Sequence, residues 1–346
     1  MMRCRIRLQI GGLRLIKEVA KDIYTFPVTL PNNPLKALNV YVIKGADRTV
    51  VFDTGFNVAE SKQDLLNGLA ELDVAIEDVE VVLTHLHSDH VGLVNLFAEA
   101  GCKIYASKID GDLINGMVTN EHWDMIGSTI VLYGMEEDQL EIKDNPGYKY
   151  RLTETIDYIE LKIGDRFKVG DYDFDIMDLI GHTPGHLGFY DADKKLILSA
   201  DTVLDPITPN ITFWGFEYGD ILGTYIETLA RLRALDIDLV LATHRQIITK
   251  HVERIDELIE HHNERLQEIL DAMALGGVYT VRDISARITW RIRANNWDEF
   301  PKSQKWFAAG ETMSHLDHLV KTACVEMTQT GDLLTFKKLK ETIVPF

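Results

Sequence analysis

Residues 85–90 read HLHSDH and bring together four side chains that commonly bind metal ions. Neutral imidazole and carboxylate are favoured ligands of Zn²⁺ and of similar divalent ions. Alternate side chains of an extended segment share one face, so His85 and His87 can bind one ion. If the chain then turns, Asp89 and His90 can face a second ion. A pattern this dense predicts a metal site rather than a polar loop that happens to be rich in histidine.

Further candidate ligands lie downstream. Residues 181–186 read GHTPGH, a tight turn of glycine and proline that can push the imidazole of His182 outward. His186 lies in the same turn, and we expect it to form a hydrogen bond within the loop rather than to bind metal. Asp201 and His244 each follow a short apolar run. Surface or packing roles are expected for the histidines without acidic or imidazole partners at ligand spacing: His122, His251, His261, His262, His315 and His318.

The elements that must position these residues are short strands. Four runs rich in Val, Ile and Leu each end at an Asp or a His, and such runs are typical of strands buried on both faces. They are residues 49–52 before Asp53, 79–84 before His85, 195–200 before Asp201 and 238–243 before His244. We therefore expect one site along the edge of a sheet, with helices over 61–72, 91–100 and 220–235 between the strands.

Length and composition limit the classes of protein to which this chain can belong. The chain has 346 residues, enough for two domains, and 46% of them are hydrophobic, which excludes a disordered chain, a collagen-like chain and a disulfide-stapled miniprotein. Lys and Arg number 36 against 54 Asp and Glu, a formal charge of −18. Residues 266–346 hold as many basic as acidic residues, so the preceding part carries the whole excess. Such a surface repels nucleic acid, so a small molecule is the expected substrate.

The cellular compartment is predicted from weaker signals in the sequence. Cys4, Cys102 and Cys324 are scattered without a CxxC pair, which fits a reducing cytosol. The first residues carry arginines and no apolar run long enough for a signal peptide. No run of about 18 apolar residues exists, so no membrane helix is expected. We predict a cytoplasmic protein.

Two regions fall outside this strand pattern. Residues 108–150 are irregular and predict a helical insertion, which either packs as core or covers a pocket. A long charged helix over 251–274 ends at Gly276-Gly277, and helices over 280–291 and 311–323 precede two strands near 325–327 and 333–336. Helices followed by a hairpin indicate a winged-helix-like unit. We expect a first domain over residues 1–265 and a C-terminal domain over 266–346.

The order of these residues along the chain resembles the signature of the metallo-β-lactamase-fold hydrolase superfamily. The five matching positions are Asp53, HLHSDH at residues 85–90, His182, Asp201 and His244. The resemblance covers roughly residues 18–265, and the tail is more weakly similar to winged-helix extensions of some members. It implies an α/β fold, a four-layer αββα sandwich with two divalent ions between the sheets, with zinc expected above iron or manganese. Asp53 would hold the ligand loop by hydrogen bonds. The implied ligands are His85, His87 and His182 for one ion, Asp89, His90 and His244 for the other, and Asp201 as a bridge between them.

One departure concerns the last position, where His244 is followed by Arg245 instead of lying between glycines. The guanidinium could recognise an anionic substrate or pair with a surface acid. The residues after Asp201 are rich in aromatics, with Phe213, Trp214, Phe216 and Tyr218. These rings either wall an apolar pocket beside the metals or pack as core.

The expected chemistry is metal-assisted hydrolysis by a hydroxide shared between two ions, since no Ser or Cys triad is visible. Asp89 and Asp201 are the candidate catalytic carboxylates, with Asp89 moving the proton. An ester, thioester or lactone is the favoured substrate. The alternatives are a phosphodiesterase or ribonuclease of the same fold and, less favoured, a DNA-binding regulator. Residues 311–323 carry two acids and one lysine, a poor DNA reader, so packing or a homodimer contact is expected instead.

Overall fold

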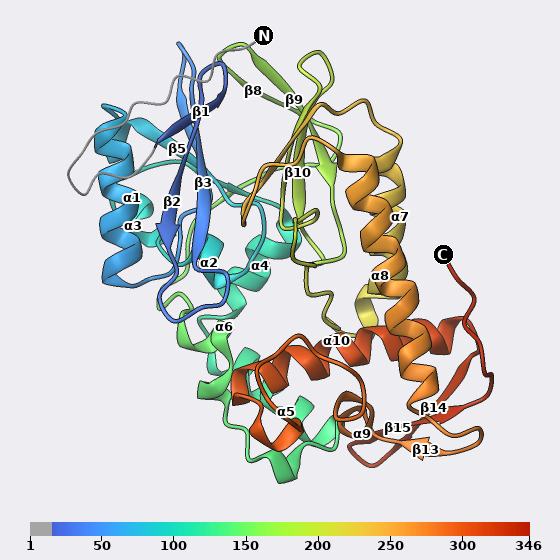
Figure 1. Cartoon of the computed structure of the whole chain (residues 1–346). Helices are drawn as coiled ribbons and strands as arrows, with labels where there is room; N and C mark the ends of the chain where they lie inside the picture. Colours follow the sequence, from blue (N-terminus) through green and yellow to red (C-terminus); the bar gives the residue numbers. More distant parts are fainter. Residues whose placement is uncertain (1–15) are drawn as a thin grey trace.

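The structure is a computed structural model that describes residues 16–346. Cys4 and the first residues, for which we expect no signal peptide, lie outside the described residues. Two β-sheets face each other, with helices on the outer face of each, and a third, smaller sheet lies in the C-terminal unit (Figure 1). This arrangement is the predicted αββα sandwich with a small, largely helical C-terminal unit.

The first sheet has seven strands in chain order. Its first four strands pair antiparallel and the remaining ones add in parallel, because helical segments cross between them. The strands are β1 (Lys17–Ala20), β2 (Ile23–Thr29), β3 (Ala37–Lys44), β4 (Thr49–Phe52), β5 (Val79–Val82), β6 (Ile104–Ala106) and β7 (Ile159–Glu160).

The second sheet has five strands in the order β12-β11-β10-β9-β8. Only β11 and β12 pair in parallel, across the crossover that contains the helix after Asp201. The strands are β8 (Arg166–Val169), β9 (Tyr172–Asp178), β10 (Leu187–Asp191), β11 (Leu196–Ala200) and β12 (Leu239–Ala242). All four strands expected to end at an Asp or His are present, as β4, β5, β11 and β12.

The layers follow from the alternation of side chains along each strand. Phe52 faces the space between the sheets and meets Phe189 edge-on with ring centroids 5.1 Å apart, whereas Val51 faces the outer helices. The helices beside the first sheet are α1 (Ala59–Glu71), α2 (Ser88–Val91) and α3 (Val94–Glu99), with the short 3₁₀ turn η1 (Ile76–Asp78) before β5. Those beside the second sheet are α7 (Ile221–Arg233) and α8 (His251–Asp271).

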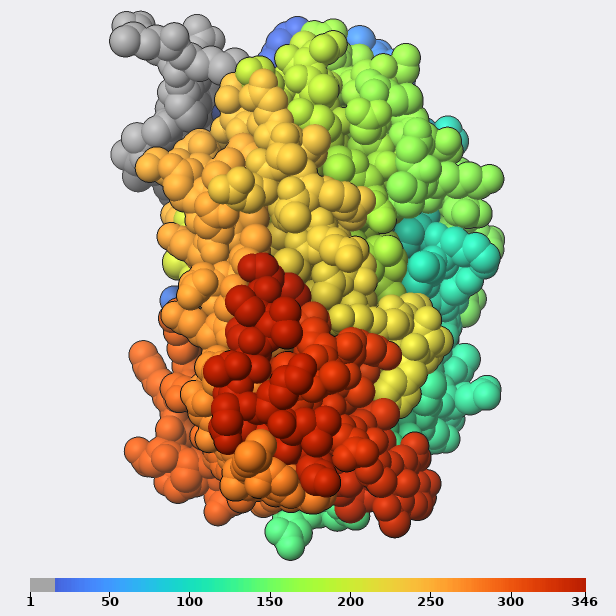
Figure 2. Space-filling model, turned by 90° about the vertical axis from the view of Figure 1, so that its right-hand side faces the viewer, coloured from blue at the N-terminus to red at the C-terminus, as the bar shows by residue number. Residues whose placement is uncertain are grey.

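The C-terminal unit packs on α7 and α8, and Figure 2 shows the C-terminal residues lying against these helices. It holds α9 (Val281–Ser285), the 3₁₀ turn η5 (Trp297–Glu299), α10 (Lys302–Lys321) and the strands β13 (Val278–Tyr279), β14 (Val325–Thr330) and β15 (Leu333–Lys338). The helix expected over 280–291 is only five residues long, and the one expected over 311–323 begins nine residues earlier, directly after Pro301. The division expected after residue 265 falls inside α8, and both it and the winged-helix character of the unit stay predictions.

The insertion is helical, as expected. It consists of α4 (Lys108–Gly116), α5 (Asn120–Leu132), α6 (Pro146–Lys149) and the 3₁₀ turns η2 (Glu136–Asp138) and η3 (Ile142–Asp144). Tyr133 and Met135 are buried in the core that the insertion shares with α9 and α10. Packing is therefore established for this segment. Among the described residues, no helix combines the length and the apolar character needed to cross a membrane.

Candidate metal centre

The first cluster of ligand atoms consists of three imidazoles. His85 follows β5, His87 lies at the N-terminal end of α2, and His182 comes from the turn after β9. Their ring nitrogens lie within 4.8 Å of one another, and His85 Nε2 is 3.1 Å from His87 Nδ1. Two ring nitrogens that approach this closely from different directions fit a shared ion.

The second cluster joins Asp89, His90 and His244, again within 4.8 Å. Asp89 Oδ2 lies 3.3 Å from His244 Nε2 and 3.9 Å from His90 Nε2. Asp89 and His90 lie in α2, directly after His87 at its N-terminal end, while His244 follows the end of β12. The turn inferred from the HLHSDH pattern is thus present as the start of a helix.

Asp201 lies between the two clusters. Its Oδ2 is 3.5 Å from His182 Nε2, 3.6 Å from His90 Nε2 and 3.5 Å from His244 Nε2. It also forms a group within 4.8 Å with His85 and His90, one residue from each cluster. The structure therefore brings all seven sequence-predicted ligand residues to one place, with Asp201 in the position that a bridging carboxylate would need.

Three ring nitrogens at the centre have no hydrogen-bond partner although they are buried: Nε2 of His90, of His182 and of His244. Buried polar atoms are almost always paired, because an unpaired one forfeits its interaction with water. In each ring the other nitrogen, Nδ1, forms a hydrogen bond to an oxygen. The Nδ1 of His90 lies 2.8 Å from Asp53 Oδ2, that of His182 lies 2.8 Å from Asn210 O, and that of His244 lies 2.9 Å from Ala37 O. An Nδ1–H donated to oxygen leaves the lone pair of Nε2 aimed into the site, as in metal-binding histidines. The donor set fits two divalent ions.

Asp53 organises the ligand loop, as the resemblance implied. Besides His90 Nδ1, its carboxylate accepts hydrogen bonds from Thr84 N at 2.9 Å and Thr84 Oγ1 at 2.8 Å. Thr84 Oγ1 in turn lies 3.0 Å from Nδ1 of His85. One fully buried carboxylate thus orients an imidazole of each cluster.

The chain turns sharply where three of the strands deliver site residues. Asp53, Ala200 and Arg245 adopt positive φ angles of 62°, 44° and 64°. Left-handed backbone costs energy for residues other than glycine and recurs at functional sites. These turns end each strand abruptly at or beside a site residue, namely Asp53, Asp201 and His244.

The pKa values of His85 and His87 in the first cluster and of His90 in the second shift in opposite directions. Burial lowers the pKa of His87 to about 3 and that of His85 well below its usual value, with neighbouring imidazoles adding to the effect. Burial alone would also lower the pKa of His90, but Asp53, Asp201 and Asp89 raise it well above its usual value. Burial opposes ionisation of Asp89, yet His90 and His244 lower its pKa to about 2. The lowered pKa values of His85, His87 and Asp89 favour the uncharged imidazoles and the ionised carboxylate that bind metal, whereas His90 has to give up a proton when an ion binds.

Sequence reasoning missed Asp110, from the first turn of α4. Its buried carboxylate accepts hydrogen bonds from Leu86 N at 3.0 Å, Thr183 Oγ1 at 2.6 Å and Gly185 N at 2.8 Å. It therefore ties the HLHSDH loop to the GHTPGH loop. Burial raises the pKa of Asp110 to about 6 despite these bonds. No spacing signal could have found it, because its partners are brought together only by the fold.

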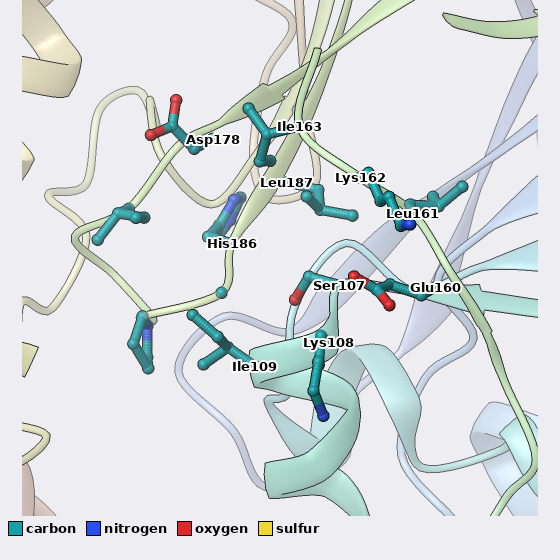
Figure 3. Close-up of a pocket in the computed structure, with 13 residues that line it drawn as sticks. Ser107, Lys108, Ile109, Glu160, Leu161, Lys162, Ile163, Asp178, His186 and Leu187 are labelled. Carbon is teal, nitrogen blue, oxygen red and sulfur yellow. The ribbon is translucent and has the colours of Figure 1, made fainter. Parts of the chain in front are cut away.

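His186 belongs to none of the ligand groups found among the described residues. Its buried ring stacks on His85 with centroids 4.7 Å apart, and its Nδ1 lies 3.4 Å from Oγ1 of Thr202, a residue outside the GHTPGH turn. Its Nε2 is buried without a hydrogen-bond partner, so the hydrogen bond expected within the loop is not found. A cavity of 210 Å³ lies beside this turn and is lined by His186, Leu187, Ile109 and Ile163 (Figure 3). None of the seven ligand residues lines it.

The aromatic segment after Asp201 lies partly over the metal centre. The Trp214 ring is 5.8 Å from that of His87, and its Nε1–H donates to His182 O at 3.1 Å. Phe216 is 46% exposed and the adjacent Phe213 meets it edge-on at 4.9 Å, while Tyr218 is half-buried in the 3₁₀ turn η4 (Phe216–Tyr218). The guanidinium of Arg245 donates to Pro34 O at 2.6 Å.

Comparisons with known proteins agree with this geometry. The chain is similar to a probable metallo-hydrolase, YqjP, of Bacillus subtilis (strain 168), with 22% identity over 87% of this chain and 93% of that protein. It is also similar to the acyl-coenzyme A thioesterase MBLAC2 of Homo sapiens, with 23% identity over 48% of this chain and 58% of that protein.

Among solved structures, a metallo-beta-lactamase family protein from Thermus thermophilus shares the fold with a TM-score of 0.76 and 24% identity, over 93% of this chain and 100% of that one. Because 93% of this chain is more than residues 16–265 alone could supply, the structural similarity extends into the C-terminal unit. The model of the metallo-beta-lactamase superfamily matches residues 36–244, which run from the start of β3 to the last predicted ligand and cover more than half of the chain. The chain belongs to the metallo-beta-lactamase superfamily.

Proposed function

We propose that this protein is a hydrolase with two divalent metal ions that cleaves an ester, thioester or lactone of a small molecule with an apolar part. The observation that carries the proposal is the set of three buried, unpartnered Nε2 atoms arranged around the carboxylate of Asp201. His85, His87 and His182 would hold one ion, Asp89, His90 and His244 the other, and Asp201 would contact both. Zinc suits this donor set, as do iron and manganese.

When bound, the two ions would supply a water of lowered pKa and a positive charge that polarises the scissile carbonyl. The chain's own residues do the rest. The carboxylate of Asp89, ionised at neutral pH and placed 3.3 Å from His244 Nε2, can accept the proton of the attacking water and pass it to the leaving group. Asp53 and Asp110 keep the ligand loops in register.

The surroundings of the centre favour an acyl substrate. The Trp214 ring lies beside that of His87, with centroids 5.8 Å apart, and Phe216, two residues further along the chain, is exposed. Apolar side chains beside a polar reaction centre are typical of sites that bind the hydrocarbon part of a ligand. The acyl-coenzyme A thioesterase activity named for the human relative agrees with a thioester. With a formal charge of −18, the surface opposes a ribonuclease role.

A DNA-binding role receives little support from α10. Between Thr312 and Leu319 every residue of this helix is buried against α7, α8, α9 and the loop after Asp201. A recognition helix needs an exposed face to enter the major groove. This burial favours packing as the role of the C-terminal helix.

The proposal is tested by elemental analysis of the purified protein, paired with a panel of acyl esters, acyl thioesters, lactones and single-stranded RNA. We expect two ions per chain and turnover of acyl compounds. His87→Ala should lose most of the metal and all turnover, whereas His122→Ala, in the insertion, should keep both. Cleavage of RNA alone at low enzyme concentration, or a protein that stays metal-free after dialysis against zinc, iron and manganese, would overturn the proposal.

A further inference from the structure

The metal ligand His182 is held on two sides by one short segment, residues 210–214. Its ring donates Nδ1–H to Asn210 O at 2.8 Å, and its own carbonyl accepts the Nε1–H of Trp214 at 3.1 Å. The direction in which Nε2 of His182 points therefore depends on the position of this segment. The segment has no strand or helix of its own, so something else must fix it.

That support is α10. Asn210 Nδ2 donates to Glu311 Oε2 at 2.8 Å, a contact between residues 101 positions apart. The side chain of Glu311 is 12% exposed, and its other oxygen lies 3.8 Å from Arg265 Nε of α8. Three more hydrogen bonds run between the same two segments: Asn210 Nδ2 to Phe307 O, Phe213 N to Gly310 O at 3.1 Å and Ser314 Oγ to Ile211 O.

The contact is also tight. A Cβ at Gly310 would overlap Oγ1 of Thr212 and lie 3.3 Å from Cβ of Thr212, so only glycine lets α10 approach this closely. The helix and the segment thus meet through both hydrogen bonds and backbone packing. A displacement of α10 would be passed to Asn210 O and Trp214, and from there to His182.

We infer that α10 acts as the support that positions His182, with Asn210, Glu311 and Gly310 as positioning residues that set the affinity of the ion at His85, His87 and His182. The inference rests on the metal centre of the proposed function but not on its substrate. It gives the C-terminal unit a role in metal binding, although none of the seven ligand residues belongs to that unit. Residues that orient a histidine ligand typically change metal affinity by about 10- to 100-fold when they are replaced.

The first experiment exchanges the hydrogen-bond partners. In Asn210→Asp, two carboxylates face each other and push the segment away from α10. In the double variant Asn210→Asp/Glu311→Gln, the Gln amide can donate to the new carboxylate and restore the contact in reverse. We expect Asn210→Asp to weaken binding of one of the two ions by about tenfold or more and the double variant to regain most of that affinity.

The second experiment alters packing without charge. Gly310→Val places a side chain against Thr212, whereas Gly127→Val in α5 is the matched control, because a Cβ at Gly127 has no atom within 4 Å. Only Gly310→Val should weaken one ion site. Thermal unfolding of each metal-free variant shows whether the variants fold, and Asn210→Asp keeps the test valid if Gly310→Val does not.

The readouts are the two zinc dissociation constants from competition with a chromophoric chelator and the visible absorption of the cobalt-substituted protein. We expect one weakened constant and a changed cobalt spectrum in Asn210→Asp, with both reverting in the double variant. Unchanged constants in folded Asn210→Asp and Gly310→Val, or no recovery in the double variant, would overturn the inference. A wild-type chain that binds no metal would refute the metal centre itself, whereas inactivity on every acyl substrate with both ions bound would refute only the substrate assignment.

Discussion

Asp53 and His90 form a fully buried pair in which the carboxylate accepts the Nδ1–H of the imidazole at 2.8 Å. The pair leaves Nε2 of His90 without a partner, 3.6 Å from Asp201 Oδ2. Asp53 thereby determines which nitrogen of His90 faces the centre, because a ring that donates from one nitrogen offers the lone pair of the other.

Asp53→Ala should therefore lower metal affinity more than it lowers acyl-substrate affinity. We expect about a 10- to 100-fold loss in binding of one ion, because His90 loses its orienting partner and Thr84 loses an acceptor. Titration with a metal-chelator indicator measures the loss. An unchanged stoichiometry and affinity would contradict the orienting role.

Asp110→Ala should destabilise the metal-free protein by about 3 kcal/mol, since three donors of the two ligand loops lose their buried acceptor. The same variant should bind metal more weakly. Urea unfolding of metal-free protein measures the first effect. The control is Asp112→Ala on the same helix, whose side chain is 57% exposed and whose loss should change little.

Asp138→Ala should release the insertion from the C-terminal unit. Its carboxylate accepts hydrogen bonds from Lys305 at 2.6 Å, Arg282 at 2.9 Å and Trp297 at 2.8 Å, and Lys305 is nearly inaccessible to water. An unpaired charge left in such a place costs about 3–5 kcal/mol of unfolding free energy. Glu137→Ala, one residue earlier and exposed, should leave the unfolding midpoint near that of the wild type.

His315 should make stability dependent on pH. Burial lowers the pKa of His315 to about 3, whereas an unfolded histidine has a pKa near 6.5. Between these values the unfolded chain binds a proton that the folded chain does not, so this contribution to stability is complete above pH 6.5 and is lost as the pH falls toward 3.

Unfolding free energies of the wild type and His315→Gln, measured from pH 7.5 to pH 4, test this. The variant should take up about one proton fewer on unfolding near pH 5, so its stability should fall less steeply with acid. Parallel curves would show that His315 is not held uncharged against His262, whose Nδ1 lies 3.0 Å away.

Phe216→Ala should separate binding of the acyl chain from chemistry. Losing part of a phenyl contact amounts to about 1 kcal/mol, so KM for a long-chain acyl substrate should rise about fivefold while kcat stays the same. A short-chain substrate should show no change in either constant. Met125→Ala, which removes another exposed apolar side chain from the insertion, is the control. An equal change for both chain lengths would remove Phe216 from the substrate surface.

The sequence by itself was enough to predict the residues that gather at the candidate metal centre and the strands that deliver them. HLHSDH and the apolar runs before Asp53, His85, Asp201 and His244 are local patterns, and local patterns reflect the chemistry and burial that each segment requires. The ends of the C-terminal helices could be predicted less well from the sequence. Helix α10 begins directly after Pro301, nine residues before the expected start, because its packing partners extend the helix in that direction.

Only the tertiary structure decided what surrounds the ligands. Asp110 reaches both ligand loops, Asn210 joins His182 to Glu311, and Asp138 joins the insertion to Lys305. These contacts link residues that lie between 24 and 167 positions apart. The hydrogen-bond partner of a single Asp or Asn cannot be predicted from the residues around it in the sequence. The partner is decided by the packing of elements that are far apart in the sequence.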